Sequence, residues 1–584
     1  MSKVHRGDFA VNARLLRITL IAAVIGALST IAAFVLLDLI RLFTNLFFFQ
    51  SFSVADRSPA GNRLGPLVIA LPAVGGLIVG LMAYFGSDKI RGHGIPEAIE
   101  VILFGKSKMS AKVAVLKPIS SGIVIGSGGP FGAEGPVIMT GGAIGSLLAQ
   151  LFHLTGAERK ALLVAGAAAG MTAVFGTPVA AVLLAIELLL FELRPRSLLP
   201  VAIACAVAGF CRPLLIASGP LFPLQTAELP AADFLWCIVA GVCSGALAAA
   251  LSVALYRVED LFASLPIHWM WWPALGGVAV GVGGWLQPRA LGVGYDVIGD
   301  LLHYHLALGV ALALLAVKAV IWVIALGSGT SGGVLAPLLM MGAGLGVVLG
   351  HFFPGSDPAV WPLVCMAATL AGTMRAPLTA TIFAVGLTHD ANALLPLLAT
   401  SATAYGFTVL TMKRSILTEK IARRGYHIYR EYGIDPLERQ FVEEVMTKSV
   451  SSIDSACTVP EAIRGFFGTH QAHRAFPVVE DGRLLGIVDR AMVAGWVEES
   501  AAKPIGELCG NRQPQFAVLG ESCRSVATRL ARYRLERLPV VKDAASMELV
   551  GLIARSDLIK PSIIHFEEEE KRERLLRFRR RRKA

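Results

Sequence analysis

Charged side chains are scarce in this chain. Asp, Glu, Lys and Arg make up 16% of its 584 residues, whereas hydrophobic residues make up 55% and the mean hydropathy is +0.64. Soluble domains typically carry about 25% charged residues. The composition therefore excludes a purely soluble protein and predicts a membrane protein with a soluble part.

The cysteines also show none of the spacings typical of disulfide frameworks or metal sites. The eight cysteines contain no CxxC pair, and five of them lie in apolar segments. Scattered cysteines of this kind behave as small core residues. Neither a disulfide framework nor a zinc site is expected.

Long unbroken apolar runs are few. A membrane span needs about 20 apolar residues, and many of the runs here are shorter or are interrupted by Gly and Pro. This pattern is typical of transporters with tilted and half-length helices. The runs are Leu20–Phe49, Pro66–Phe85, Val137–Leu151, Val179–Phe191, Pro200–Gly219, Leu235–Tyr256, Trp271–Leu286, Leu306–Leu326, Gly333–Phe353 and Leu394–Met412.

Three glycine-rich breaks interrupt the apolar part, at residues 92–97, 126–136 and 327–337, and each carries a proline that suits the first turn of a helix. The second break holds Glu134. An intramembrane charge is costly, so it predicts a functional site. A helix N-terminus carries about half a positive charge and attracts anions. Glu134 is thus predicted where an anion would bind, with a simple helix cap as the alternative.

These breaks resemble the signature motifs of the CLC family of chloride channels and chloride/proton exchangers. The motifs GSGIP, G(K/R)EGP and GxFxP are similar to residues 92–96, 132–136 and 333–337, in that order. The resemblance covers about residues 15–423. It implies a dimer with one pore per subunit, inverted repeats, and Glu134 as a gate that leaves the outer anion site when protonated. The anion-binding residues that it implies are His93, Gly94, Ile95, Gly132, Val334, Leu335 and Leu417.

Four of these motif positions differ from the family's usual residues. Ala133 replaces Lys or Arg, and His93 replaces a serine that donates to the central anion. A neutral imidazole keeps one N–H donor, although a packed His93 is the alternative. Leu335 replaces Phe, where only the backbone amide is needed. Leu417 replaces the inner tyrosine and cannot donate, so the inner anion site is expected to be weakened.

The inner proton position is degenerate. Exchangers of the family usually carry two consecutive glutamates after a motif similar to Phe175–Pro178; here Glu187 is followed by Leu188. Glu187 is expected to be structural, bonded to neighbouring backbone. Lys318, inside an apolar run, is expected to line an anion vestibule, with a paired or snorkelling lysine as the alternative.

The soluble part contains a repeat. Phe476–Val479 followed by Gly486–Val488, and Leu538–Val541 followed by Gly551–Ile553, are each preceded by a helix-like run. The pattern resembles a tandem CBS pair, or Bateman module. The resemblance places Asp557 at a nucleotide-ribose position, so an adenine nucleotide is a candidate ligand. Ala554 and Met492 depart from that nucleotide-binding pattern.

The predicted domains are a transport domain over residues 1–423, a linker over 424–440, CBS repeats over 441–500 and 501–562, and a charged tail over 563–584. The basic end of the tail is expected to lie in solvent near anionic headgroups, with no nucleic-acid partner. The basic N-terminus and soluble C-terminus predict that both termini are cytoplasmic and that the protein lies in the plasma (inner) membrane.

The sequence thus predicts a mainly α polytopic membrane protein with repeated halves and broken helices, plus a small α/β tandem CBS domain. The main function predicted is a homodimeric CLC-type chloride channel in the lipid bilayer, without enzymatic activity or resident cofactor. The alternative is a chloride/proton antiporter, and fluoride is a second candidate anion. A CBS-regulated divalent-cation transporter is disfavoured because the breaks hold few carboxylates. A membrane-anchored nucleotide sensor is disfavoured because an anchor needs no such breaks.

Overall fold

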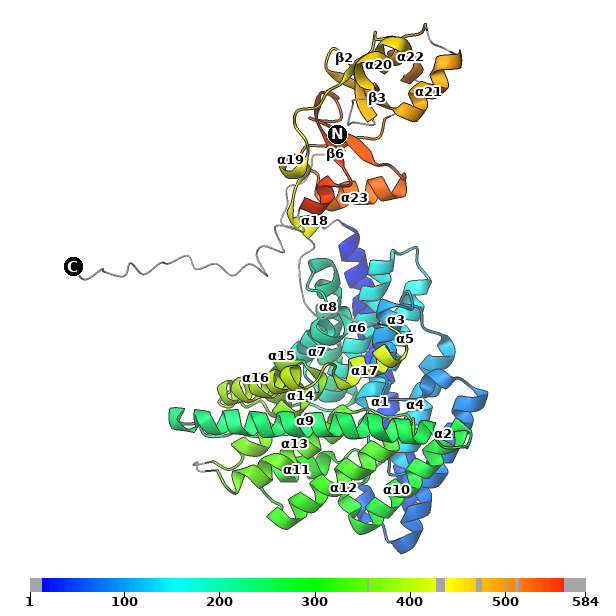
Figure 1. Cartoon of the computed structure of the whole chain (residues 1–584). Coiled ribbons are helices and arrows are strands. Elements are labelled where there is room, and N and C mark those ends of the chain that lie inside the picture. The colour runs from blue at the N-terminus through cyan, green and yellow to red at the C-terminus, as the bar shows by residue number, and fades with distance from the viewer. Residues whose placement is uncertain are drawn as a thin grey trace, which may run out of the picture. The chain divides into compact units, whose positions relative to one another are not determined.

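The computed structural model describes residues 13–353, 357–426, 436–468, 475–499, 502–509 and 514–560. The chain divides into two compact units, one within residues 11–430 and one within residues 431–584 (Figure 1). The predicted tail over residues 563–584 and most of the predicted linker lie outside the described residues. Each unit is considered by itself.

The first unit is helical throughout its described part. Its first half contains α1 (Arg14–Phe49), α2 (Ala70–Phe85), α3 (Ile95–Leu103), α4 (Ala111–Gly126), α5 (Glu134–Gln150), α6 (Gly156–Phe175), α7 (Pro178–Leu184) and α8 (Pro195–Leu215). Its second half contains α9 (Phe234–Ala263), α10 (Trp272–Leu286), α11 (Tyr295–Leu302), α12 (Leu308–Gly327), α13 (Leu335–Gly350), α14 (Val360–Met374), α15 (Pro377–Thr388) and α16 (Leu394–Thr411), followed by α17 (Ile416–Arg423).

Helix length and burial divide these elements into two kinds. Six segments of the described chain are long and apolar enough to cross a membrane. Others, such as α5, α13 and α14, are short and almost wholly buried inside the unit. Half-length helices inside the protein can bring their ends to the middle of a bilayer, because irregular backbone there is shielded from lipid. The protein is therefore a multi-pass membrane protein of mostly helical fold.

The two halves are related by an approximate two-fold axis. The order of elements from α2 to α8 recurs from α10 to α16, about 200 residues later. The contacts between the halves are reciprocal: Gly132 and Gly333 exchange backbone hydrogen bonds of 3.3 and 3.0 Å. The N–H of Gly92 donates to Gly329, and correspondingly that of Gly292 donates to Gly128. Pairs of this kind are what a two-fold relation between repeats produces.

The second unit contains two small sheets. The first has the order β1 (Ile453–Asp454), β2 (Ala475–Glu480), β3 (Arg483–Asp489), and the second has the order β4 (Ala517–Val518), β5 (Arg537–Val541), β6 (Leu549–Ala554). In each sheet a parallel pair is followed by an antiparallel pair. The helices of this unit are α18 (Pro436–Arg439), α19 (Val442–Val445), α20 (Val459–Phe466), α21 (Arg490–Glu499), α22 (Ile505–Cys509) and α23 (Cys523–Arg532).

The strands of both repeats lie where the sequence predicts them. Apolar strand residues such as Val478 and Val540 are buried in two separate small cores. The repeats join through backbone bonds from Leu484 to Met547 and from Leu549 to Gly482, at 2.8 and 3.1 Å. The repeats thus contact each other through their strand turns.

Candidate anion pathway

Glu134 is the first residue of α5 and its side chain is fully buried. Its Oε1 accepts a hydrogen bond of 3.1 Å from the N–H of Ala336, in the first turn of α13. Its Oε2 is buried and has no hydrogen-bond partner among the described residues. The carboxylate therefore bridges two helix N-termini, whose partial positive charges favour an anion at that point.

Two glycines make room for this carboxylate. A Cβ at Gly132 would lie 1.9 Å from Glu134 Oε2, and one at Gly333 would lie 2.6 Å from its Cδ. Because these glycines also exchange backbone hydrogen bonds, the starts of α5 and α13 are locked together around the carboxyl group. The sequence brings a negative group to the place where a small anion would otherwise contact the amides.

The loop before α3 packs against the start of α5. Gly94 has φ of +91°, and a Cβ there would lie 2.6 Å from the carbonyl oxygen of Gly135. Glu97 caps the helix by accepting from the Gly94 N–H at 2.9 Å, and its other oxygen lies 3.6 Å from Lys420 and 3.2 Å from Arg424. This network fixes the loop that carries His93.

His93 itself is 2% exposed. Its Nδ1 is buried and has no hydrogen-bond partner in the described part of the chain. Its carbonyl oxygen packs against Gly135, the residue after Glu134. The imidazole thus has a free polar atom close to the predicted central site, while its role in anion binding stays a prediction.

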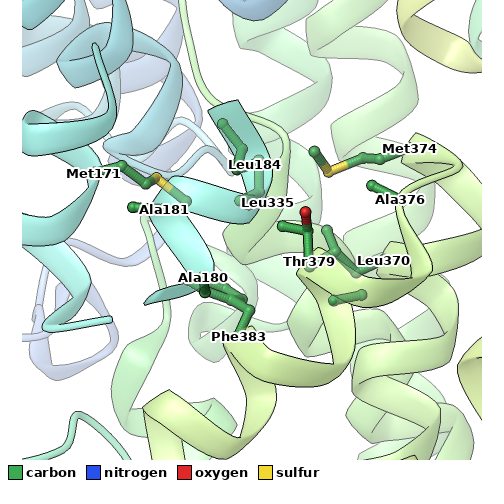
Figure 2. A pocket seen from close by; sticks show the side chains of 11 residues that line it. Met171, Ala180, Ala181, Leu184, Leu335, Leu370, Met374, Ala376, Thr379 and Phe383 are labelled. Atoms are coloured by element: carbon green, nitrogen blue, oxygen red, sulfur yellow. The ribbon is translucent and has the colours of Figure 1, made fainter. Parts of the chain in front are cut away.

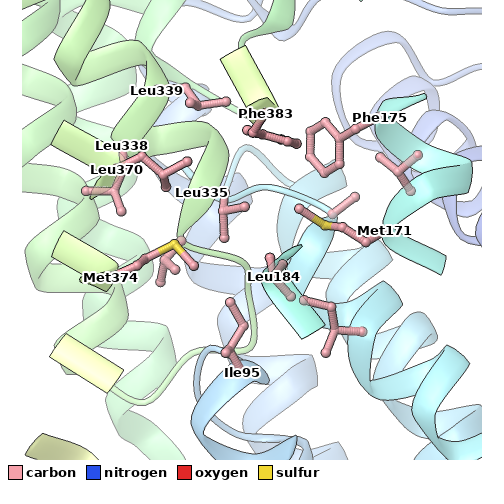
Figure 3. Packing of buried hydrophobic residues seen from close by; sticks show 14 of the residues in the cluster. Ile95, Met171, Phe175, Leu184, Leu335, Leu338, Leu339, Leu370, Met374 and Phe383 are labelled. Carbon is pink, nitrogen blue, oxygen red and sulfur yellow. The ribbon is translucent and has the colours of Figure 1, made fainter. Parts of the chain in front are cut away.

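The other predicted anion-binding positions are buried together. Figure 3 shows Leu335 within an apolar cluster that also includes Ile95 and Leu184. Val334 and Leu417 are at most 1% exposed in the same cluster. Only their backbone groups have the polarity to contact an anion.

Tyr256 of α9 was not anticipated from the sequence. Its hydroxyl donates to the carbonyl oxygen of Ile416, the first residue of α17. Tyr256 lies in a long apolar run, and no local pattern singles it out. The bond anchors the helix that carries Leu417.

The prediction that Lys318 lines a vestibule is wrong. Its Nζ is fully buried and donates to the carbonyl oxygens of Ala290 and Gly292 at 2.9 and 2.8 Å. Lys117, at the equivalent place in the first half, donates to Ile90 and Gly92 at 2.7 and 2.9 Å. Both ammonium groups satisfy carbonyls of the loops before α3 and α11, which is why neither faces an open cavity.

A cavity of about 470 Å³ does lie on one side of the first unit. Its lining includes Arg91, Lys108, Lys420 and Arg424 together with Glu97 and other acidic groups. Basic side chains around a cavity raise the local anion concentration. Six basic and four acidic side chains line this cavity, and Lys318 is not among them.

The inner proton position is apolar. Leu188 is fully buried, in a π-helical stretch over Ala185–Leu190. Glu187 accepts from both the N–H and the hydroxyl of Thr379, at 2.8 and 2.6 Å. Glu187 thus links the first half of the unit to α15 in the second half. The sequence analysis predicts bonds to backbone near Glu187 instead.

A small cavity of about 10 Å³ separates Thr379 from Leu335 (Figure 2). Its walls are formed almost wholly by apolar side chains, including Met171, Met374 and Phe383. That volume is at the lower limit for one water molecule, and an apolar lining offers it few partners. The cavity therefore offers little room or polarity for water.

In the second unit, Asp557 is already engaged. One of its oxygens accepts from the N–H of Ala554 at 2.8 Å, and the other pairs with Lys560 at 2.7 Å. The backbone amide and the lysine already take up part of the hydrogen-bonding capacity of this carboxylate. Nucleotide binding at this position stays a prediction.

Two family models match the chain. Residues 75–409 match the one described as voltage gated chloride channel, and residues 442–499 and 505–562 match the CBS domain. Both matches agree with the resemblance drawn from the glycine-rich breaks and from the repeated strands.

Curated relatives and solved structures agree with this match. An H(+)/Cl(-) exchange transporter ClcA of Klebsiella pneumoniae is 28% identical over 424 residues, covering 68% of this chain and 88% of that protein. The same transporter of Salmonella arizonae is 26% identical, covering 66% and 84%. A slow cyanobacterial Cl-/H+ antiporter has a similar fold, with a TM-score of 0.64 at 22% identity over 71% of this chain and 99% of that chain. A eukaryotic CLC transporter has a TM-score of 0.59 at 18% identity, over 93% and 98%.

Proposed function

Because the chain belongs to the voltage-gated chloride channel family, we propose that it exchanges chloride for protons across a membrane, with Glu134 as the gate. The observation that carries this proposal is the buried carboxylate on the Ala336 amide, at the joined starts of α5 and α13. An anion and the ionised carboxylate compete for the same amides. Protonation removes the carboxylate's charge and weakens its hold on the amides, so proton uptake and anion entry become linked.

The curated relatives described above support exchange over the channel that the sequence analysis puts first. Both are H(+)/Cl(-) exchange transporters by name, and they match about two thirds of this chain. We therefore place the antiporter ahead of the channel.

A chloride channel is the second candidate, and Leu188 is the observation that favours it. A leucine at the inner proton position cannot carry a proton, and Leu417 supplies no hydroxyl to the inner anion site. The small cavity beside Thr379 is also apolar and offers a water molecule few partners. Exchange by this chain is accordingly expected to be slow.

The test is a chloride gradient imposed on proteoliposomes at zero potential, with chloride efflux and lumenal pH recorded together. An exchanger moves protons uphill at the expense of the chloride gradient. Chloride flux without any proton movement would establish the channel instead.

Glu134→Gln identifies the gate in the same assay. The amide cannot ionise, so chloride flux should persist or rise at neutral pH, lose its pH dependence and no longer drive protons. Glu158→Gln is the matched control, because Glu158 caps α6 at the surface and should leave coupling unchanged. Unaltered pH dependence in Glu134→Gln would remove Glu134 from the mechanism.

The assembly proposed is a homodimer in the plasma membrane, with both termini in the cytoplasm. The exposed apolar side chains of α8 and α16, such as Phe210 and Leu410, support burial of this face in lipid or in a second copy. Mass measurement of the detergent-solubilised protein by light scattering distinguishes a dimer from a monomer.

A further inference from the structure

The two-fold relation gives the gate a neighbour that the sequence motifs do not indicate. Tyr295 is the first residue of α11 and corresponds to Ile95, the first residue of α3. By the same relation, Glu134 at the start of α5 corresponds to Leu335 at the start of α13. Ile95 and Leu335 share one buried cluster (Figure 3). The equivalent pair in the other half is Tyr295 and Glu134.

Both members of this second pair carry a polar atom without a partner. The Tyr295 hydroxyl and Glu134 Oε2 are each buried and make no hydrogen bond to the residues that the structure describes. The charge of Glu134 is near enough to act electrostatically on the tyrosine. Burying a polar group without a hydrogen bond is unfavourable, and native proteins seldom leave such atoms unsatisfied. The Tyr295 hydroxyl can donate a hydrogen bond and Glu134 Oε2 can accept one, so each could satisfy the other.

The tyrosine ring is held independently of its hydroxyl. It makes edge-to-face contacts with Phe175 and Phe222, with ring centroids 6.3 and 6.1 Å away. The preceding loop is fixed by the two bonds from Lys318 to backbone carbonyls. Removing only the hydroxyl should therefore leave the packing intact.

The other ionisable groups around this pair are few. Lys318 of α12 reaches the loop before α11 and is bound to carbonyls, and Asp296 follows Tyr295 on α11. On the inner side, the loop that carries His93 packs against Gly135. Within the described residues, the Tyr295 hydroxyl and His93 Nδ1 are both buried without a partner, and the two-fold relation pairs the tyrosine with Glu134.

We propose that the Tyr295 hydroxyl donates a hydrogen bond to the second carboxylate oxygen of Glu134 and so holds the ionised gate closed. The phenol or the carboxylate rotates to form this bond. Tyr295 is then a positioning residue for the gate. It supplies a hydroxyl at the outer site from the second half of the chain. At the central and inner positions, His93 and Leu417 replace the serine and the tyrosine that the family resemblance places there. The inference rests on the proposed gating by Glu134.

Tyr295→Phe in the full chain tests this. A hydrogen bond to an ionised carboxylate favours the ionised, closed gate. Without it, protonation and opening become easier, so the midpoint of the flux–pH curve should move upward by about one pH unit, the size expected for a bond to a charged group. Replacing Tyr295 with 3-fluorotyrosine, a more acidic phenol and stronger donor, should move the midpoint downward. This opposite shift tests the idea even if the Phe variant folds poorly.

Tyr304→Phe is the matched control. It removes a hydroxyl that bonds to Val347 in the same half, and the midpoint should stay in place. In the Glu134→Gln background, Tyr295→Phe should have no further effect.

A Tyr295→Phe curve that superimposes on the parent's, or that rises equally at every pH, overturns the inference while leaving the gate intact. A pH response that survives Glu134→Gln instead overturns the gate itself, so the two failures are distinguishable.

Discussion

The side chains at the centre of the candidate anion pathway differ in how many contacts fix their positions. Glu134 has one oxygen bound and glycines shaped around it, so its position is specified from several sides. His93 has a fixed backbone, but its Nδ1 has no partner. The imidazole is thus the group whose contribution to anion selection is open to direct measurement.

Replacing His93 with Ser should change anion selectivity. A serine hydroxyl also donates one hydrogen bond but is smaller than the imidazole, and it is the residue that the family resemblance places there. The chloride-to-fluoride flux ratio should rise by about two- to tenfold, as one altered hydrogen bond allows. Flux measured with chloride, nitrate and fluoride in turn gives the ratio. His351→Ser, at the exposed end of α13, should leave it unchanged. Equal ratios in parent and His93→Ser would make His93 a packing residue.

Secondary-structure elements were predictable to very different degrees. The strands around Val478 and Val540 follow from short β-branched runs, and the helix starts at α5 and α13 follow from glycine–proline breaks. In contrast, α6 and α14 were not among the predicted apolar runs, although both are deeply buried; Ala and Gly make α6 only weakly hydrophobic. Small residues permit close packing of helices in membranes, a signal that hydropathy does not record.

Lys318 shows that the environment of a buried polar residue is also hard to predict from the sequence. The sequence indicates that a lysine inside an apolar run has a special environment, but not which one. Its carbonyl partners lie 26 and 28 residues away, on a loop whose shape depends on tertiary packing. Tyr295 was equally hard to predict, because its pairing with Glu134 follows only from the two-fold relation between the halves.

Gly94→Ala should disrupt the loop before α3. The residue has φ of +91°, and a Cβ there would lie 2.6 Å from Gly135 oxygen, so strain and a backbone clash act together. We expect a loss of about 2 kcal/mol or more in stability and reduced chloride flux. Thermal unfolding in detergent measures the first. Gly299→Ala is the control, since that helical glycine has nothing within 4 Å of its Cβ position and should be neutral or stabilising. An unchanged melting temperature for Gly94→Ala would contradict the clash.

The whole molecule combines a transport unit and a CBS unit, each with its own buried core. The fold class and the family of both parts follow from sequence motifs, because repeated motifs survive where overall identity is low. The regulatory role of the second unit does not follow in the same way. A ligand site depends on a few side chains, and here Asp557 is bonded within its own turn.

Ending the chain after Tyr426 should separate transport from regulation. If the transport unit folds alone, the shortened protein should still carry chloride but lose any response to adenine nucleotides. Flux in proteoliposomes with and without ATP, ADP or AMP measures this, and nucleotide binding to the full chain is the companion measurement. Full-length protein that neither binds nor responds would leave the CBS unit a purely structural element.

The bond between Glu134 and Ala336 also has a consequence for synthesis. Its partners are 202 residues apart, so the ribosome finishes the first half well before the second provides the amide. At about 5–20 residues per second, this interval lasts roughly 10–40 s. During that time the nascent first half holds a carboxylate in its apolar interior without its amide partner. We expect that water, protonation or the insertion machinery stabilises this carboxyl group until then, and that mutations which slow translation of residues 216–335 lower the yield without altering the finished protein.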